Sequence, residues 1–158
     1  MNAQVRKAGE HDLSRLLAWV PAFHLHHAIP EPEGGLTNAI THLLTDAKLG
    51  SIWIVEVGAA LQPVGYIAMC YGYSIEFGGR DAFVDEMFLE PHVRGQGHGR
   101  AALEQVITRT RAEGIRALHL HLEVAEDNAP AERFYAPLGF EKRSGYRLMT
   151  LLLTDGRS

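Results

Sequence analysis

A glycine-rich stretch near the middle of the chain, residues 89–100, has the residue types that a phosphate-binding loop needs. Gly95, Gly97 and Gly99 alternate between a predicted strand and a predicted helix. Because glycine has no Cβ atom, the loop can turn tightly and a ligand can approach its backbone N–H groups. The helix dipole and the unpaired first N–H groups of the helix add partial positive charge there. The stretch therefore predicts a diphosphate site without a lysine or a metal ion; the alternative is a turn that only permits tight packing.

Two other nucleotide-binding patterns can be compared with this stretch. A P-loop ends in Gly-Lys-Ser or Gly-Lys-Thr, and neither is present. Residues 97–102 match a relaxed dinucleotide pattern, G-x-G-x-x-A, and Glu123 ends the next predicted strand. That pattern normally follows the first strand of a parallel sheet, whereas several predicted strands precede it here. A dinucleotide-binding enzyme is therefore the weaker alternative.

Hydrophobic periodicity predicts the elements that position this loop. Apolar residues at helical spacing predict a helix from Leu13 that is capped by Asp12 or Ser14, and Pro30 ends that pattern. A second helix is predicted at residues 36–45. Strands are predicted at residues 4–8, 52–57, 64–73, 82–89, 117–124 and 147–153, with further helices from about Gly97 to Gly114 and from about Asn128 to Pro137.

The predicted order of elements is βααβββαβαβ. It indicates an α/β (α+β) fold with an antiparallel hairpin and one central βαβ crossover. No repeat, linker or low-complexity tract divides the 158 residues, so we expect a single domain, 1–158.

Composition limits the classes of partner. The net charge of −4 argues against nucleic acid, because phosphate binding needs a basic surface. No stretch approaches the roughly 20 apolar residues that cross a bilayer, and the first seven residues lack the apolar core of a signal peptide. We therefore expect a cytoplasmic protein with no membrane partner. Cys70 is the single cysteine, which excludes an internal disulfide and predicts a buried, inert thiol.

Two motifs in order resemble those of a known family. Residues 94–99 (Arg-Gly-Gln-Gly-His-Gly) match R/Q-x-x-G-x-G/A. The second pattern, N-x-x-A-x-x-F/L-Y-x-x-x-G-F, is matched by Asn128, Ala131, Phe134, Tyr135, Gly139 and Phe140. The chain thereby resembles the GCN5-related N-acetyltransferases, the GNAT family. The resemblance implies the GNAT fold, which has a mixed and mostly antiparallel sheet with flanking helices. It also implies acetyl-CoA as the co-substrate, and no metal is expected.

The resemblance also implies which residues hold acetyl-CoA. The backbone of Met87, Phe88 and Leu89 would pair with the pantetheine arm like an extra strand, and Asn128 would lie near that arm. The diphosphate would lie on the loop and helix start formed by Arg94, Gly95, Gln96, Gly97, His98, Gly99 and Arg100.

Acetyl transfer to an amine sets the remaining chemistry. An amine with a pKa of about 10 is mostly protonated near pH 7, so a base must take its proton, through water. Members of the family often have an acidic residue at one of the two positions that Asp85 and Glu86 occupy here. Adjacent residues on a strand point to opposite faces unless a bulge intervenes, so we expect at most one of them to face the acetyl group. By resemblance, a backbone N–H near Met87 would polarise the carbonyl and Tyr135 would protonate the departing thiolate.

Several histidines have no assigned role. His24, His26 and His27 precede Pro30, while His119 and His121 share a strand face with Glu123. Either group could be a polar surface, line a substrate pocket or relay protons. No metal is expected.

The sequence does not identify the acceptor. A polyamine, an amino acid, an antibiotic amine and a protein N-terminus all fit, and Glu31 and Glu33 could attract a cationic amine. A non-catalytic acyl-CoA-binding module with the same fold is the alternative from another class. The apolar run at residues 148–153 is compatible with a homodimer paired through C-terminal strands.

Overall fold

The computed structural model describes residues 3–120, 133–146 and 149–153 of the chain. The chain forms two compact units, Met1–Ala125 and Glu126–Ser158, and each unit is described by itself. The expectation of a single domain stays a prediction.

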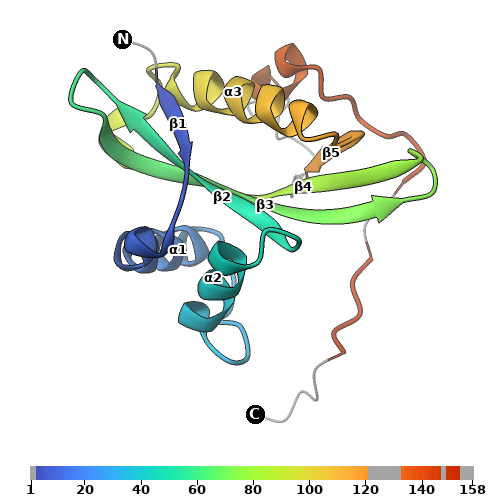
Figure 1. The fold of residues 1–158 in the computed structure, drawn as a ribbon, viewed down its shortest axis with the longest axis horizontal. Coiled ribbons are helices and arrows are strands. Elements are labelled where there is room, and N and C mark those ends of the chain that lie inside the picture. The colour runs from blue at the N-terminus through green and yellow to red at the C-terminus, as the bar shows by residue number, and fades with distance from the viewer. Residues whose placement is uncertain (1–2, 121–132, 147–148, 154–158) are drawn as a thin grey trace. The chain divides into compact units, whose positions relative to one another are not determined.

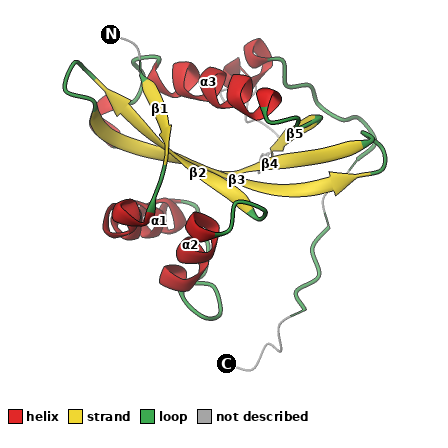
Figure 2. Cartoon of the chain, viewed as in Figure 1, coloured by secondary structure: helices red, strands yellow, loops and turns green. Residues whose placement is uncertain are grey.

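The first unit is built on a sheet with helices on both faces. Figure 1 shows α1 and α2 on one face and α3 on the other, and Figure 2 separates helices from strands by colour. The described strands lie in the order β1-β2-β3-β4-β5. The elements are β1 Gln4–Lys7, α1 Leu13–His26, α2 Leu36–Thr45, β2 Gly50–Val57, β3 Gln62–Ser74, β4 Gly79–Leu89, α3 His98–Ala112 and β5 Ala117–Leu120.

The sheet is mostly antiparallel. β1 to β4 pair antiparallel in sequence order, and only β5 pairs parallel, with β4. A parallel pair needs a crossover connection, and α3 supplies it. The predicted α/β class, mixed sheet and central βαβ crossover are therefore confirmed. The predicted helices and strands up to residue 120 lie within three residues of the observed ones.

The core on one face lies between the sheet and helices α1 and α2. Trp19 of α1 stacks on Tyr66 of β3, with ring centroids 6.4 Å apart, and contacts Phe88 of β4 at 6.3 Å. The apolar residues of α1 recur at helical spacing, so one side of the helix is buried. The buried cluster consists of Leu16, Trp19, Val20, Ile40, Ile52, Ile54, Tyr66, Ala68 and Phe88. This packing holds α1 against β4.

The beginning of α1 differs from the predicted cap. Asp12 occupies the N-cap position, but its side chain makes no capping hydrogen bond. Its carboxylate instead accepts two hydrogen bonds from the Arg6 guanidinium, at 2.7 and 2.8 Å, and one from the Gly9 N–H at 3.0 Å. A bidentate bond to a guanidinium is stronger than a single hydrogen bond to a backbone N–H, so the ion pair determines where the carboxylate points.

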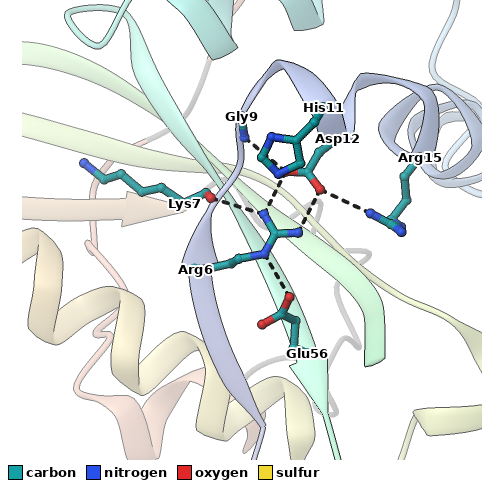
Figure 3. A network of polar contacts seen from close by, with 7 residues as sticks. All are labelled: Arg6, Lys7, Gly9, His11, Asp12, Arg15 and Glu56. Carbon is teal, nitrogen blue, oxygen red and sulfur yellow. Dashed lines mark hydrogen bonds and ion pairs between the residues drawn. The ribbon is translucent and has the colours of Figure 1, made fainter. Parts of the chain in front are cut away.

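Figure 3 shows the polar network that results, which we call the Arg6 network: Arg6, Lys7, Gly9, His11, Asp12, Arg15 and Glu56. Arg6 also donates to Glu56 of β2 at 2.8 Å, and Arg15 of α1 lies 3.2 Å from Asp12. The hydrogen bond from Arg6 is the main cause that lowers the pKa of Asp12 to about 2. The network therefore ties β1 to the start of α1 and to β2.

The second unit contains the end of the predicted fourth helix. Residues 133–135 are helical, and a 3₁₀ turn, Ala136–Leu138, follows them. Gly139 then adopts a left-handed conformation with φ +89°, which favours glycine. The part of the predicted helix before residue 133 lies outside the described residues.

The predicted last strand is wrong where it can be compared. Residues 149–153 form no strand, and Met149, Leu151, Leu152 and Leu153 are exposed. An apolar run predicts that a segment can be extended, whereas a strand exists only when its backbone groups pair with a neighbour. The predicted residues 121–124 of the preceding strand lie outside the described part of the chain.

Candidate active site

A β-bulge lies at the middle of β4. Ala68 of β3 pairs with Glu86, whereas the next residue, Met69, pairs with Val84, so Asp85 is an extra residue in β4. A bulge interrupts the alternation of side chains between the two faces of a sheet. Asp85 and Glu86 were expected to point to opposite faces only in a strand without a bulge. Since the bulge lies at Asp85, that expectation does not apply.

The side chain of Glu86 is held by two hydrogen bonds. Its Oε1 lies 2.5 Å from Nε2 of His24, at the end of α1, and its Oε2 accepts a 2.5 Å hydrogen bond from the Tyr66 hydroxyl of β3. The Glu86 side chain is 15 % exposed, while Tyr66 is fully buried. We call these three residues the Glu86 cluster. It joins α1, β3 and β4 and leaves part of the carboxylate open to solvent.

Electrostatics keep the hydroxyl and the nearby thiol protonated. Burial, with the charge of Glu86 as the next cause, raises the pKa of Tyr66 well above its usual range. Burial also raises the pKa of the Cys70 thiol to about 11, and the Asp85 carboxylate adds to that shift. A protonated thiol is a poor nucleophile. Tyr66 is therefore a lasting hydrogen-bond donor, and Cys70 fits the predicted inert role.

Asp85 lies close to the same residues but is exposed. Its charge acts on both Tyr66 and Cys70, and these two residues share one face of β3 because they are four apart on that strand. The bulge thus brings two carboxylates toward one face of the sheet, and only that of Glu86 has the two short hydrogen bonds.

The glycine-rich stretch has the predicted arrangement of strand, loop and helix. After β4 ends at Leu89, a 3₁₀ turn, Pro91–Val93, leads into the loop, and Gly97 is the N-cap residue of α3. Gly95 and Gly97 have φ of +72° and +82°, and a Cβ added at either would meet nothing within 4 Å. Glycine is therefore required by backbone conformation, and the space above these two residues is open.

The start of α3 can accept an anion. No side chain caps the helix, so its first N–H groups keep their capacity to bind a ligand. Arg94 is turned back to β4, where its Nε donates to the Leu89 carbonyl at 2.7 Å, and Gln96 donates to the His92 carbonyl at 2.9 Å. Arg100 pairs with Glu104 on the surface of α3 at 3.1 Å. These side chains brace the loop and leave its backbone accessible.

A cavity of about 150 Å³ lies where α1 meets the end of β4. It brings together the residues predicted for the pantetheine arm and the first residue of the predicted diphosphate loop. It also adds Phe23 and His26 of α1 and His27, which follows the helix; the sequence assigned none of them to the cofactor. The only signal for the two histidines was the histidine cluster before Pro30. The lining residues are Phe23, His26, His27, Met87, Phe88, Leu89 and Arg94.

The histidine clusters divide. His24 contacts Glu86, whereas His26 and His27 line the cavity. His119 lies 3.4 Å from Asp81 and packs against Phe83, while His121 and Glu123 lie outside the described residues. Within the described ranges, no group of three or more His, Cys, Asp or Glu side chains could hold a metal ion.

Two of the remaining predicted site residues, Asn128 and Tyr135, belong to the second unit. Asn128 lies outside the described residues. The Tyr135 ring packs edge-on against Phe134, with centroids 4.8 Å apart, and against Phe140 at 5.6 Å. Burial raises the pKa of Tyr135, so its phenol is protonated near neutral pH. Glu31 and Glu33, in the loop between α1 and α2, are exposed.

Comparisons with known proteins agree with this arrangement. The family model described as the acetyltransferase (GNAT) family matches residues 12–140. An uncharacterized N-acetyltransferase of Methanocaldococcus jannaschii is 32 % identical over 83 residues, which are 52 % of this chain and 36 % of that protein. The match thus spans only about a third of the length of that curated relative.

Solved structures extend the likeness to nearly the whole chain. An integron cassette protein from the mobile metagenome of Cole Harbour Salt Marsh is 33 % identical, with a TM-score of 0.80, over 96 % of this chain and 91 % of that one. A possible acetyltransferase from Clostridium difficile 630 has a TM-score of 0.79 at 17 % identity, over 96 % and 99 % of the two chains. The second likeness concerns the fold alone.

Proposed function

The chain belongs to the acetyltransferase (GNAT) family, and from this premise we propose that it transfers the acetyl group of acetyl-CoA directly to an amine. One observation carries the proposal: Glu86, with its two short hydrogen bonds, directly precedes the β4 residues that line the cavity. The proposed base and the proposed thioester site are therefore consecutive on one strand.

The residues present fit acetyl-CoA. An uncapped helix start next to Gly95 and Gly97 offers N–H groups and open space to a diphosphate. The cavity beside Met87–Leu89 offers an apolar wall, together with His26 and His27, to the pantetheine arm. When bound, acetyl-CoA supplies the reactive thioester. Met87–Leu89 and the loop from Arg94 to Arg100 would bind and orient it, and Asn128 stays in this proposal by family resemblance.

We assign the base to Glu86 rather than to Asp85. An ionised carboxylate accepts a proton from the amine, through water, as the amine nitrogen bonds to the acetyl carbon. Glu86 is partly buried and fixed by two donors, so it is oriented for this role, whereas Asp85 is exposed. Asp85 adds negative charge beside it, which favours the approach of a cationic amine.

The leaving group needs a proton as the carbon–sulfur bond breaks. Tyr135 is proposed to donate it, because its pKa is raised and its phenol is protonated at neutral pH. The negative charge that develops on the carbonyl oxygen needs a donor, and a backbone N–H near Met87 is the family-like choice. No covalent enzyme intermediate is required, and the protonated Cys70 thiol does not favour one.

The setting of the reaction is also a proposal. We place the reaction in the cytoplasm, in line with the expectation from composition. No helix of the described residues is long and apolar enough to cross a membrane. A homodimer stays a prediction, and sedimentation velocity of the purified protein checks it.

A thermal-shift titration tests cofactor and reaction class together. Acetyl-CoA and CoA are expected to raise the melting temperature by mass action, while NAD and ATP are not. A free-thiol assay with acetyl-CoA and a panel of amines then measures release of CoA. Binding of CoA without release with any amine class would favour the non-catalytic module, and a shift with NAD alone would favour the dinucleotide enzyme.

A further inference from the structure

We propose that His24 is a positioning residue that holds Glu86 as the base, in the neutral form with its proton on Nε2. The inference rests on the proposed function and deepens it, because it assigns a role to a residue of α1 that lies 62 positions from Glu86 in the sequence. It also decides which member of the His24–Glu86 pair takes the proton of the amine.

The first argument is the contact itself. Nε2 of His24 and Oε1 of Glu86 are 2.5 Å apart, and the two side chains are 12 % and 15 % exposed. Tyr66 donates to the other carboxylate oxygen at the same distance. A carboxylate with a donor on each oxygen is restricted in rotation, and its ionised form is stabilised.

The second argument is the other ring nitrogen. Nδ1 of His24 is buried and has no hydrogen-bond partner among the described residues. A proton on Nδ1 would place an N–H donor, or the charge of an imidazolium, in a buried position without an acceptor among the described residues. The neutral ring with its proton on Nε2 avoids both costs and donates that proton to Glu86.

This arrangement excludes His24 as the base in this conformation. Its Nε2 is engaged by Glu86, and its Nδ1 cannot be reached by water or an amine. Each oxygen of Glu86, in contrast, has lone-pair capacity beyond its single short hydrogen bond. The proton therefore goes to the carboxylate, and His24 acts through it.

The groups that face Glu86 come from three elements. α1 contributes His24, and β3 contributes Tyr66, which stays protonated, with the protonated Cys70 farther along the strand. β4 contributes Asp85, an exposed carboxylate next to Glu86 in the chain. Of these groups, His24 and Tyr66 donate hydrogen bonds to Glu86.

His24 lies near the end of α1, close in sequence to two residues that line the cavity. His26, the last residue of α1, and His27, which follows it, line the cavity beside Met87, the residue that follows Glu86. The contact with His24 thus fixes the carboxylate of Glu86 to the helix that lines the proposed cofactor site.

Two variants separate positioning from proton transfer. His24→Ala removes the donor and is expected to lower kcat about tenfold to a hundredfold, with a smaller change in KM. His24→Gln keeps an N–H near the position of Nε2 and cannot act as a base, so it is expected to recover most of the activity.

The matched control is His42→Gln, an exposed histidine on α2 whose Nδ1 contacts the Asn38 carbonyl. It should leave kcat and KM unchanged. Two results would overturn the proposal: His24→Gln as impaired as His24→Ala, which would make His24 a proton acceptor, or His24→Ala as active as the parent protein.

A spectroscopic measurement tests the same point without any amine. The ¹⁵N shifts of the histidine rings, with His24 assigned by difference against His24→Gln, report which nitrogen carries the proton. We expect the proton on Nε2 and none on Nδ1, and a proton on Nδ1 would overturn the proposal. If no variant and no parent protein releases CoA, the proposed function fails, and the ring shifts still decide how His24 meets Glu86.

Discussion

The Arg6 network and the Glu86 cluster are both polar groups that join several elements, yet they differ in how their charge is balanced. In the Arg6 network, the fully buried Asp12 meets a guanidinium bidentately, and Glu56 meets the same cation. In the Glu86 cluster, the carboxylate meets an imidazole and a hydroxyl, and a second carboxylate lies nearby. The first arrangement neutralises charge and stabilises the fold, while the second leaves a carboxylate that can accept a proton.

Glu86→Gln tests the catalytic role of the Glu86 cluster, and we expect it to cause the greatest loss of activity. The amide keeps the shape of the side chain but cannot take a proton, so kcat/KM is expected to fall about 10²- to 10⁴-fold. Stopped assays of CoA release measure it, with Glu10→Gln as the control, since Glu10 is an exposed carboxylate ahead of α1. A loss below threefold would mean that Glu86 is not the base.

Asp12→Ala tests whether the Arg6 network stabilises the fold. Removal of one partner of a buried ion pair leaves the charge of Arg6 without its main partner, and the free energy of unfolding is expected to fall by about 3 kcal/mol. This is the lower end of the usual range, because Arg6 is one third exposed and keeps Glu56. Urea unfolding measures the change, and kcat of the folded fraction should stay near that of the parent. A loss under 1 kcal/mol would contradict this account of the network.

Tyr66→Phe tests how much the hydrogen bond from Tyr66 contributes to the function of Glu86. The ring stays in the core beside Trp19 and Phe88, and only the hydrogen bond to Glu86 is lost. A hydrogen bond to a charged group is worth about 1.5–3 kcal/mol, so kcat/KM is expected to fall about tenfold. Steady-state kinetics check it, and an unchanged rate would show that one donor is enough to hold the carboxylate.

The dependence of stability on pH gives the smallest effect. The folded pKa of Asp12, about 2, lies below its ordinary value of 3.8. The stabilisation from this group is therefore fully present above about pH 4 and is lost as the pH falls toward 2. Unfolding curves of the parent protein and Asp12→Asn should converge in that window. Curves that stay parallel down to pH 2 would contradict the lowered pKa.

The two clusters also differ in how far the sequence could predict them. The strands, the helices and the glycine-rich loop follow from local periodicity and turn residues, and Met87–Leu89 and Arg94 were predicted by motif and do line one cavity. Asp85 and Glu86 were both named by family resemblance, and the sequence could not choose between them, because the bulge at Asp85 depends on the register between β3 and β4.

Contacts between distant segments could not be predicted. The pairing of His24 with Glu86 and of Arg6 with Glu56 joins residues 62 and 50 positions apart, and no local pattern records such a contact. Asp12 or Ser14 was predicted as the helix cap, because nothing in the local pattern shows that Asp12 pairs with Arg6 of β1. The strand predicted near the C-terminus was wrong for a related reason. Its apolar residues suggested an extended segment, but the sequence did not show which neighbouring strand it would pair with.

The central claim is that one cluster performs chemistry while the other maintains the fold, and a paired assay of Glu86→Gln and Asp12→Ala tests it most directly. Each variant is measured for melting temperature and for amine-dependent CoA release at a temperature where both are folded. The account predicts that Glu86→Gln loses release and keeps its melting temperature, while Asp12→Ala melts earlier and keeps release. Parallel loss of both properties in both variants would contradict it.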